Sequence, residues 1–336
     1  PDLVTKSYAA FGQLTYSHTS NLRATGGLRF TREEKSQGGS FGFVIPPEGA
    51  GACGAFDSAT SFCTFPLNGE LNASRLTYKA GLEYDAGPNS LLYANVSTGF
   101  KAGGFYGSQA PNTFRPEKLT AYTFGAKNRF FDNKLQFNLE VFYWDYKDQQ
   151  ITHVGPVRPI GFTVITENAG KSRLYGAEAD LIWSPSARDM FHANVQYLNT
   201  KYTDLHSTQT TLAGPPATVC PTTPVAGQPE VVVNCSGNPV MLSPKWTANL
   251  SYSHRFPLAN GSELEAQVGT QIQSGYWTGI EYLPGERQKA STVSNASLTY
   301  RPDGSRFTIS AYIDNIEDST VKAFAFVQPV LGMPVV

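Results

Sequence analysis

Charged residues are scarce in this sequence and long apolar runs are missing, and each of these features excludes a class of protein. Charged residues make up only 16% of the 336 residues and leave a formal net charge of −1. A chain so balanced offers no basic surface for nucleic acid. No apolar run approaches the roughly 18 residues that a membrane-spanning helix requires. If this protein crosses a bilayer, it must therefore do so as a closed β-barrel, because a barrel satisfies every backbone polar group internally.

The motifs of common enzyme classes are missing as well. There is no nucleophile elbow and no phosphate-binding loop of the P-loop type. The glycine-rich segment Thr98–Gly104 enters a loop and does not open a helix, so it lacks the helix N-terminus that binds phosphate. The five histidines show no metal-binding spacing; they are His18, His153, His192, His206 and His254. The sequence therefore indicates no enzyme, no metal site and no cofactor.

Cysteine is scarce, and its placement indicates loop disulfides. The four cysteines form two local pairs, Cys53 with Cys63 and Cys220 with Cys235, each within a stretch rich in Gly, Pro, Ser and Thr. Metal sites usually have shorter spacing, with further Cys or His nearby. Two disulfides in an oxidising compartment fit this placement better than metal ligands or free thiols. The sequence alone leaves the pairing open.

Alternation with a period of two is the dominant pattern that is present, and the segment 119–149 shows it best. After Asp132–Lys134, the apolar residues Leu135, Phe137, Leu139, Val141 and Tyr143 alternate with Gln136, Asn138 and Glu140. Successive side chains of a strand point to opposite faces, so this segment is predicted to be a two-faced β-hairpin. Its apolar run has a length of about 9–11 residues, which is what a tilted strand needs to cross a bilayer.

Similar strand pairs recur along the chain, and matching them to the alternating template gives about a dozen strands. Their connections alternate between tight turns and long segments; the long ones are 36–73, 101–118, 150–166, 203–241 and 276–290. An up-and-down meander then places every tight turn at one rim and every long segment at the other. Outer-membrane barrels have short periplasmic turns and long extracellular loops. We therefore predict an all-β, antiparallel up-and-down transmembrane β-barrel with these five segments as extracellular loops.

Aromatic residues bracket the apolar face in two groups. Near the tight turns lie Tyr16, Tyr84, Trp183, Tyr252 and Tyr300, and near the long loops lie Tyr8, Phe30, Phe100, Tyr143 and Trp246. Two aromatic girdles around small aliphatic residues are typical of a barrel that contacts outer-membrane lipid at both interfaces. The alternative is a soluble sandwich whose aromatic residues fill its core, but a sandwich has no reason to sort its loops by rim.

Five stretches in this order resemble the C-terminal part of the β-barrel domain of TonB-dependent outer-membrane receptors. They are LLYANVSTGFKAGGF (91–105), RPEKLTAYTFGAKNRFFDNKLQFNLEVFYWDYKDQQI (115–151), ENAGKSRLYGAEADLIWSP (167–185), LSPKWTANLSYSHRF (242–256) and SAYIDNIEDST (310–320). The resemblance implies a plugged barrel of about 22 strands in the outer membrane of a Gram-negative bacterium. It also implies uptake of a scarce ligand driven through TonB, most often a ferric siderophore and sometimes cobalamin, haem or carbohydrate.

The sequence departs from this family pattern in three ways. The plug domain with its energy-coupling box, the early strands and a last strand ending in an aromatic residue are not among the 336 residues. Residues 1–336 are therefore expected to be a partial barrel domain with about 12 of a probable 22 strands. Contact with the TonB energy-transducing complex is expected to run through the plug domain.

Polar and aromatic loop residues are the candidate ligand contacts under this resemblance. Arginine and aromatic rings suit anionic chelates that carry aryl groups, although each residue taken alone can equally well pack a loop. The candidates are Phe105, Tyr106, Arg115, His153, Arg158, Tyr276, Trp277 and Tyr282. Two other functions stay open: a passive porin with a self-contained 12-stranded barrel, and a surface adhesion or structural barrel whose loops 36–73 and 203–241 bind other proteins.

Overall fold

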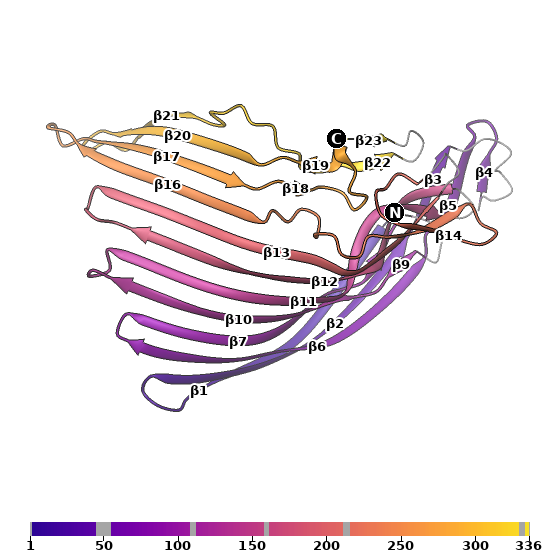
Figure 1. Ribbon diagram of the computed structural model, residues 1–336, viewed down its shortest axis with the longest axis horizontal. Helices are drawn as coiled ribbons and strands as arrows, with labels where there is room; N and C mark the ends of the chain where they lie inside the picture. Colours follow the sequence, from indigo (N-terminus) through magenta and orange to yellow (C-terminus); the bar gives the residue numbers. More distant parts are fainter. Residues whose placement is uncertain are drawn as a thin grey trace.

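One curved antiparallel sheet makes up most of the molecule. The computed structural model describes residues 2–44, 55–107, 112–157, 161–210, 216–328 and 333–335. Twelve strands follow one another in the order β1-β2-β6-β7-β10-β11-β12-β13-β16-β17-β20-β21, so each strand pairs with its neighbours in sequence along this path. Figure 1 shows a curved wall with the tight turns at one end and the short strands and both termini at the other. The prediction of an antiparallel up-and-down meander is confirmed.

The twelve strands of the wall are β1 (Asp2–Ser17), β2 (Leu22–Gly38), β6 (Gly69–Gly87), β7 (Ser90–Lys101), β10 (Glu117–Phe130), β11 (Leu135–Val157), β12 (Gly161–Trp183), β13 (Asp189–Thr210), β16 (Trp246–Pro257), β17 (Glu263–Gln273), β20 (Ser291–Arg301) and β21 (Ile309–Ile313). The connections from β1 to β2, from β6 to β7 and from β10 to β11 are tight turns, as are the later connections at that rim. Among the described residues, no helix is long and apolar enough to span a membrane.

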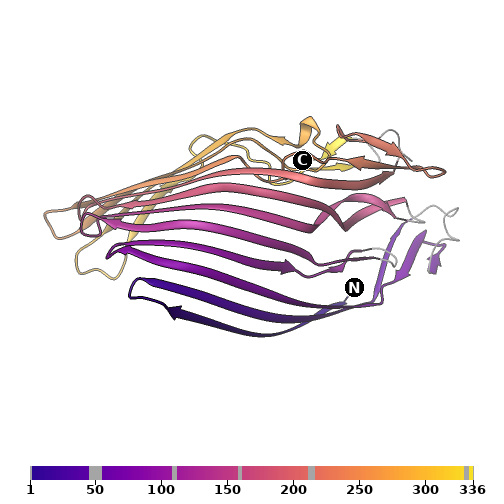
Figure 2. The ribbon, with the colours of Figure 1, turned by 60° about the horizontal axis from the view of Figure 1, so that its bottom comes forward.

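Short elements occupy the long-loop end. They are β3 (Ser40–Val44), β4 (Ala55–Asp57), β5 (Phe62–Pro66), β8 (Gly104–Phe105), β9 (Thr113–Phe114), β14 (Thr222–Pro224), β15 (Glu230–Asn234), β18 (Tyr276–Trp277), the 3₁₀ turn η2 (Pro284–Glu286), β19 (Arg287–Gln288), β22 (Phe326–Gln328) and β23 (Met333–Val335). They form small sheets of their own, except that β15 also pairs with the end of β13. In the turned view of Figure 2 they gather at the end of the sheet opposite the tight turns.

Several strands extend farther toward the long loops than the sequence pattern indicated. Strands β11 and β12 stay paired up to Val157 and Gly161, through the segment 150–166 that was expected to be a loop. Strand β13 likewise continues to Thr210 and pairs there with β15. The apolar–polar alternation reflects contact with lipid, whereas backbone pairing needs no lipid and continues beyond it. The pattern therefore predicts the membrane crossing and misses the extension of the strands above it.

The apolar face carries aromatic rows at two heights. At the tight-turn end, Trp183, Phe191 and Tyr252 stack across three strands, with ring centroids 5.2 and 4.4 Å apart. Toward the long loops, Tyr122, Tyr143 and Tyr175 lie in register on β10, β11 and β12. Tyr175 precedes Trp183 by eight residues, roughly 26 Å along a strand. That length takes a tilted strand across most of the ~25 Å apolar band of an outer-membrane barrel.

On the opposite face, the lumen wall, charged side chains pair across strands. Arg23 bonds Glu83 at 3.1 Å and also Asp85, both at the tight-turn end of β6. Arg301 bonds Glu263 and Glu265 at 3.0 and 2.6 Å. Such partly hydrated pairs add little stability, but they keep this face polar.

Two aromatic rings on the lumen wall lie over glycines of the neighbouring strand. Tyr93 is directly opposite Gly125, and Phe142 is directly opposite Gly176. A Cβ atom added to Gly125 would meet the Tyr93 hydroxyl at 2.4 Å, and one added to Gly176 would meet the Phe142 ring at 2.9 Å. A ring that covers a cross-strand glycine is a known device for fixing strand register. The hydroxyl of Tyr93 also donates to Glu140 at 2.6 Å.

The hairpin turn between β10 and β11 is at the predicted place. Phe131, Asp132 and Asn133 have positive φ values of 54°, 52° and 67°. Asparagine and aspartate adopt this left-handed conformation more readily than most residues. The two strands then pair from Phe130–Leu135 up to Lys118–Lys147.

Candidate functional site

The candidate ligand contacts that the structure describes lie at the long-loop end of the sheet. Arg158 lies outside the described residues, and so does Cys53. The remaining candidates form two groups: Phe105, Tyr106, Arg115 and His153 come from the loops between β7 and β12, and Tyr276, Trp277 and Tyr282 come from the loop between β17 and β20.

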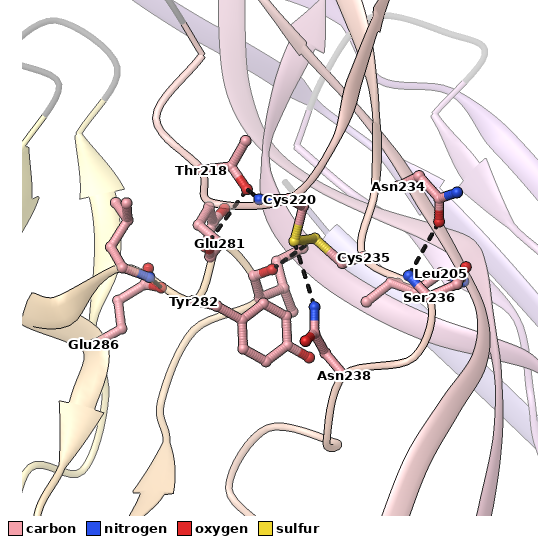
Figure 3. Close-up of a disulfide and its surroundings, with 12 residues drawn as sticks. Leu205, Thr218, Cys220, Asn234, Cys235, Ser236, Asn238, Glu281, Tyr282 and Glu286 are labelled. Carbon is pink, nitrogen blue, oxygen red and sulfur yellow. Dashed lines mark hydrogen bonds between the residues drawn. A yellow bond between two sulfur atoms is a disulfide. The ribbon is translucent and has the colours of Figure 1, made fainter.

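A disulfide holds the loop between β13 and β16 together. Cys220 and Cys235 are joined with an S–S distance of 2.00 Å, across 15 residues of sequence. This is one of the two local pairs that their placement favoured. Figure 3 shows the bond beside Asn238, whose amide lies 3.6 Å from the Cys220 sulfur. Cys63 is also disulfide-bonded and fully buried.

This disulfide belongs to a small hydrophobic core built by two loops and the extended strands. The core consists of Ile151, Tyr202, Leu205, Cys220, Val231, Val233, Cys235, Val240, Ile280 and Tyr282. Backbone bonds connect its parts: Cys235 N–H donates to Leu205 O at 2.9 Å, and Val219 N–H donates to Glu281 O at 3.1 Å. The loop after β17 is therefore docked on the loop after β13. We call this group of residues the mouth core.

The three aromatic candidates of the loop after β17 anchor that loop. Tyr282 is buried, and its hydroxyl donates to Pro239 O at 2.6 Å. Tyr276 is also buried, and its hydroxyl donates to Lys322 O at 3.2 Å. Trp277 meets Tyr282 edge-on at 5.5 Å, and the Arg287 guanidinium lies 5.1 Å from the Trp277 ring centre. In this conformation Tyr276 and Tyr282 stabilise the loop and do not offer a free surface to a ligand.

Two buried carboxyl groups lie inside the same loop. Glu281 is 5% exposed and Glu286 is 0% exposed. Glu286 Oε2 accepts the Leu283 N–H at 3.0 Å, while Glu286 Oε1 receives no hydrogen bond from any fixed donor of the described residues. The carboxyl groups of Glu281 and Glu286 influence each other's ionisation. Figure 3 shows Glu281 near the disulfide and Glu286 farther from it.

Burial raises the pKa of both carboxyl groups, because a low-dielectric site disfavours their charged forms. The pKa of Glu281 is raised to about 8, first by burial and then by the charge of Glu286. The pKa of Glu286 is raised by burial as well. Glu281 is therefore protonated at neutral pH. Among the described residues, no cation forms an ion pair with either carboxyl, and Lys322 Nζ donates to Gly285 O at 2.8 Å.

His153 links the two groups of candidates. Its side chain is almost fully buried, with Nε2 at 2.8 Å from Glu167 Oε1 and Nδ1 at 3.0 Å from Val154 O. Tyr106 lies near the same carboxylate, since its pKa is raised by burial and then by the charge of Glu167. The loop after β7 and the hairpin of β11 and β12 thus meet at Glu167, which sequence reasoning had not singled out.

A pocket of about 140 Å³ separates His153 from the loop after β17. Its walls include His153 and Val164 on one side and Met241, Thr278 and Glu281 on the other. Since one water takes up about 30 Å³, this space holds a few waters. It is smaller than the roughly 300–1,000 Å³ of ordinary ligand sites. The pocket therefore suits a small polar group and is too small for an intact chelate.

Arg115 is held by its backbone and presents its side chain to solvent. Asn168 Oδ1 accepts the Arg115 N–H at 2.6 Å, and Asn168 Nδ2 donates to Arg115 O at 2.8 Å. The same Nδ2 donates to Asp148 O at 2.7 Å. The Arg115 side chain is 73% exposed and lies 3.3 Å from Asp148 Oδ1. Of the described candidates, Arg115 is the one with an accessible charge on a fixed backbone.

Substituting Asn168 by alanine is expected to free the segment around Arg115. The change removes three hydrogen bonds, worth about 2 kcal/mol together, so local opening should become roughly thirtyfold more frequent. Amide hydrogen exchange at Arg115 measures this opening directly. Asn128→Ala is the matched control, because Asn128 donates to Phe137 O at 3.2 Å near the opposite rim. Equal exchange at Arg115 in both variants would contradict the assigned role of Asn168.

Sequence reasoning missed Glu167, Asn168, Glu281 and Glu286. No spacing marks the two buried glutamates, because an acidic residue in a loop usually indicates solvent exposure. Asn168 belongs to a stretch that carries the family resemblance, yet its partner Arg115 is 53 residues away. Only the fold brings these groups together.

Comparison with known proteins places these features in context. Residues 1–316 match the family model described as TonB dependent receptor-like, beta-barrel. The ferric yersiniabactin uptake receptor FyuA from Yersinia pestis has a similar structure, with a TM-score of 0.70 at 17% identity over 97% of this chain and 43% of that receptor. The siderophore receptor PiuA from Acinetobacter baumannii gives 0.67 at 16% identity, over 97% of this chain and 40% of PiuA.

The copper transporter OprC is also similar, with a TM-score of 0.64 at 16% identity over 98% of this chain and 44% of OprC. The chain thus spans less than half the length of these solved proteins. At such low identity the likeness concerns the fold, and the cargoes differ between the neighbours.

Proposed function

Because the chain belongs to the TonB-dependent receptor-like β-barrel family, whose members lie in the outer membrane of Gram-negative bacteria, we propose that it forms part of the wall of a TonB-dependent transporter. Its cargo in this proposal is a scarce ligand, a ferric siderophore in the first place. The observation that carries the proposal is the family match over residues 1–316. The fold shared with FyuA and PiuA supports it.

The geometry fits transport better than the two alternatives. The strand order ends at β1 and β21, and no pairing joins these two strands in the described part of the chain. A self-contained 12-stranded porin needs that pairing, because a bilayer does not tolerate open sheet edges. Of the two loops that the adhesin alternative would use, 203–241 packs into the mouth core through its described residues. In our proposal further strands and a plug domain, which contacts TonB, complete the transporter.

The long-loop end of the sheet presents side chains that can bind an anionic chelate. Arg115 presents an exposed guanidinium, which binds carboxylate or catecholate oxygens through paired hydrogen bonds. Trp277 and Arg287 form a stacked pair at the edge of the mouth core, and such pairs suit aryl groups. The small pocket beside His153 is too narrow for a chelate, so the chelate in this proposal lies above it against the loop surfaces.

Uptake measurements with the full-length protein test the proposal. A strain that lacks its own siderophore receptors should accumulate labelled ferric siderophore when it expresses the protein, and deletion of TonB should abolish this uptake. Arg115→Gln should weaken uptake about tenfold, since one charge-assisted hydrogen-bonding group is lost. Uptake that continues unchanged without TonB would overturn the proposed mechanism. If the protein takes up labelled copper in a TonB-dependent way and takes up no ferric siderophore, the proposal of a TonB-dependent transporter would stand, but its cargo would be copper.

A further inference from the structure

The outward face of the sheet carries a row of basic residues directly beyond the aromatic row Tyr122–Tyr143–Tyr175. One register step farther toward the long loops, Thr120, Asp145, Arg173 and Lys201 lie side by side on four strands. Close beyond them, Lys118 lies opposite Lys147, and Lys171 follows on β12. We call Lys118, Lys147, Lys171, Arg173 and Lys201 the basic collar.

The basic collar contains two pairs of like charges in direct cross-strand opposition. Lys118 faces Lys147 between β10 and β11, and Arg173 faces Lys201 between β12 and β13. Like charges directly opposite each other destabilise an antiparallel pair. These side chains are half-exposed or more and extend away from the sheet. The arrangement is therefore unfavourable unless an anion lies between the cations.

Protein carboxylates neutralise the collar only in part. Asp145 lies 3.7 Å from Lys147 and 3.8 Å from Arg173, so one carboxylate serves two cations. Asp204 pairs with Lys171 at 3.0 Å.

The two remaining cations are less well compensated. Asp148 lies 4.0 Å from Lys118 and is shared with Arg115 at 3.3 Å. Lys201 has no carboxylate within 4.0 Å among the residues that the structure describes. Five cations thus share three carboxylates, and a net positive charge stays on this face.

At the opposite rim, the matching position on β13 and β16 carries no like-charge pair. One step beyond Phe191 and Tyr252, toward the tight turns, Asp189 faces His254, and the two bond each other at 2.7 Å. Lipid headgroups occupy the zone just beyond an aromatic row, so the collar lies at headgroup depth in the leaflet that surrounds the long loops.

We propose that the basic collar binds the phosphate groups of anionic lipids in that leaflet. Each phosphate accepts charge-assisted hydrogen bonds from lysine and arginine, and it offsets the repulsion between Lys118 and Lys147 or between Arg173 and Lys201. The aromatic row directly below contacts the acyl chains of the same lipids. The collar is thus continuous with the lipid-contacting face, and its charge is complementary to a phosphate-bearing headgroup.

Lipid binding by the full-length protein tests this assignment. Purified protein in neutral detergent is titrated with phosphatidic acid and, separately, with phosphatidylcholine, and bound lipid is counted by native mass spectrometry. The double variant Lys118→Gln/Lys147→Gln should lose about 25-fold in affinity for phosphatidic acid, roughly fivefold for each charge. Its weak binding of phosphatidylcholine should not change. Lys127→Gln is the matched control, since Lys127 lies on the same strand as Lys118 but faces the lumen.

Several outcomes would overturn the proposal. Unchanged affinity of the double variant for phosphatidic acid would do so, as would an equal loss with Lys127→Gln. Competition by millimolar inorganic phosphate with no dependence on the acyl chains would assign the collar to free phosphate instead. In lipid-free neutral detergent, the double variant should be at least as heat-stable as the parent, because a like-charge pair is removed. A lower unfolding temperature there would mean that the lysines stabilise the sheet themselves.

Discussion

Replacing Glu281 by glutamine is expected to reduce strongly the pH dependence of the loop between β17 and β20. In the parent protein the pKa of Glu281 is raised from about 4.5 to about 8. A raised pKa in the folded state means that the stabilisation is fully present below about pH 4.5 and is lost as the pH rises through about 8. The whole difference corresponds to about 5 kcal/mol of loop stability. Glutamine stays neutral and keeps a donor for Glu286, so the loop should stay docked at high pH.

The surroundings of this carboxyl pair make the direction of the effect clear. Tyr282 and Tyr202 pack nearby, and His153 lines the other side of the adjoining pocket. The ammonium of Lys322 is bound to a carbonyl. Ionisation of both carboxyls therefore places two negative charges in the mouth core with no cation to balance them. The loop is expected to leave its docked position when this happens.

Hydrogen exchange of the Thr278 amide, which donates to Glu286 O at 2.9 Å, measures loop opening. After correction for intrinsic rates, opening in the parent should rise between about pH 5 and 8, and in Glu281→Gln it should rise much less. Glu34→Gln serves as control, because it neutralises a more exposed carboxylate at the same end of the sheet and should leave the profile unchanged. An identical rise in parent and Glu281→Gln would show that another group controls the loop.

Substituting Gly176 by alanine is expected to disrupt the wall at the junction of β12 and β13. A Cβ atom at this position would lie 2.0 Å from the backbone oxygen of Tyr197 and 2.9 Å from the Phe142 ring. A backbone oxygen in a paired strand cannot rotate away as a side chain can, so the strands must separate locally. Overpacking of this kind costs about 3 kcal/mol or more. The barrel should lose thermal stability in detergent and be inserted into the membrane in lower yield.

Two other glycines provide matched comparisons. Gly269 also lies within a strand on the lumen wall, yet the nearest atoms to its added Cβ are 3.9 and 4.0 Å away. Gly269→Ala should therefore leave the unfolding temperature nearly unchanged. Gly125→Ala should give an intermediate loss, because its clash is with the Tyr93 side chain, which can turn away at the cost of its bond to Glu140, and not with backbone. Equal losses at Gly176 and Gly269 would refute the steric argument.

The alternation of side chains was sufficient to predict the wall. The alternating residues Leu135, Phe137, Leu139, Val141 and Tyr143 share one face of β11, as expected. The turn includes Asn133, and the twelve strands run in the expected order. This succeeds because lipid on one face and water on the other impose the period of two on the sequence itself. The local pairing of Cys220 with Cys235 was also favoured by the sequence, because both residues lie in one loop.

The contacts among the loops at the long-loop end were much harder to predict from the sequence. Its contacts join residues that are distant in the chain, such as Arg115 with Asn168 or Val219 with Glu281. No periodic environment acts on these loops, so residue type is a poor guide to burial there. Tyr276 and Tyr282 were selected as ligand contacts for their aromatic rings, and those same rings pack inside the loop. Burial of Glu281 runs against the usual exposure of glutamate and could not be anticipated.

The rings of Tyr93 and Phe142 lie close to Gly125 and Gly176 on the neighbouring strands. A larger residue at either glycine would have to push the ring away from the sheet, into the space on the lumen side. The two glycines therefore keep these rings close to the wall, and a change at either one would narrow the space beside it.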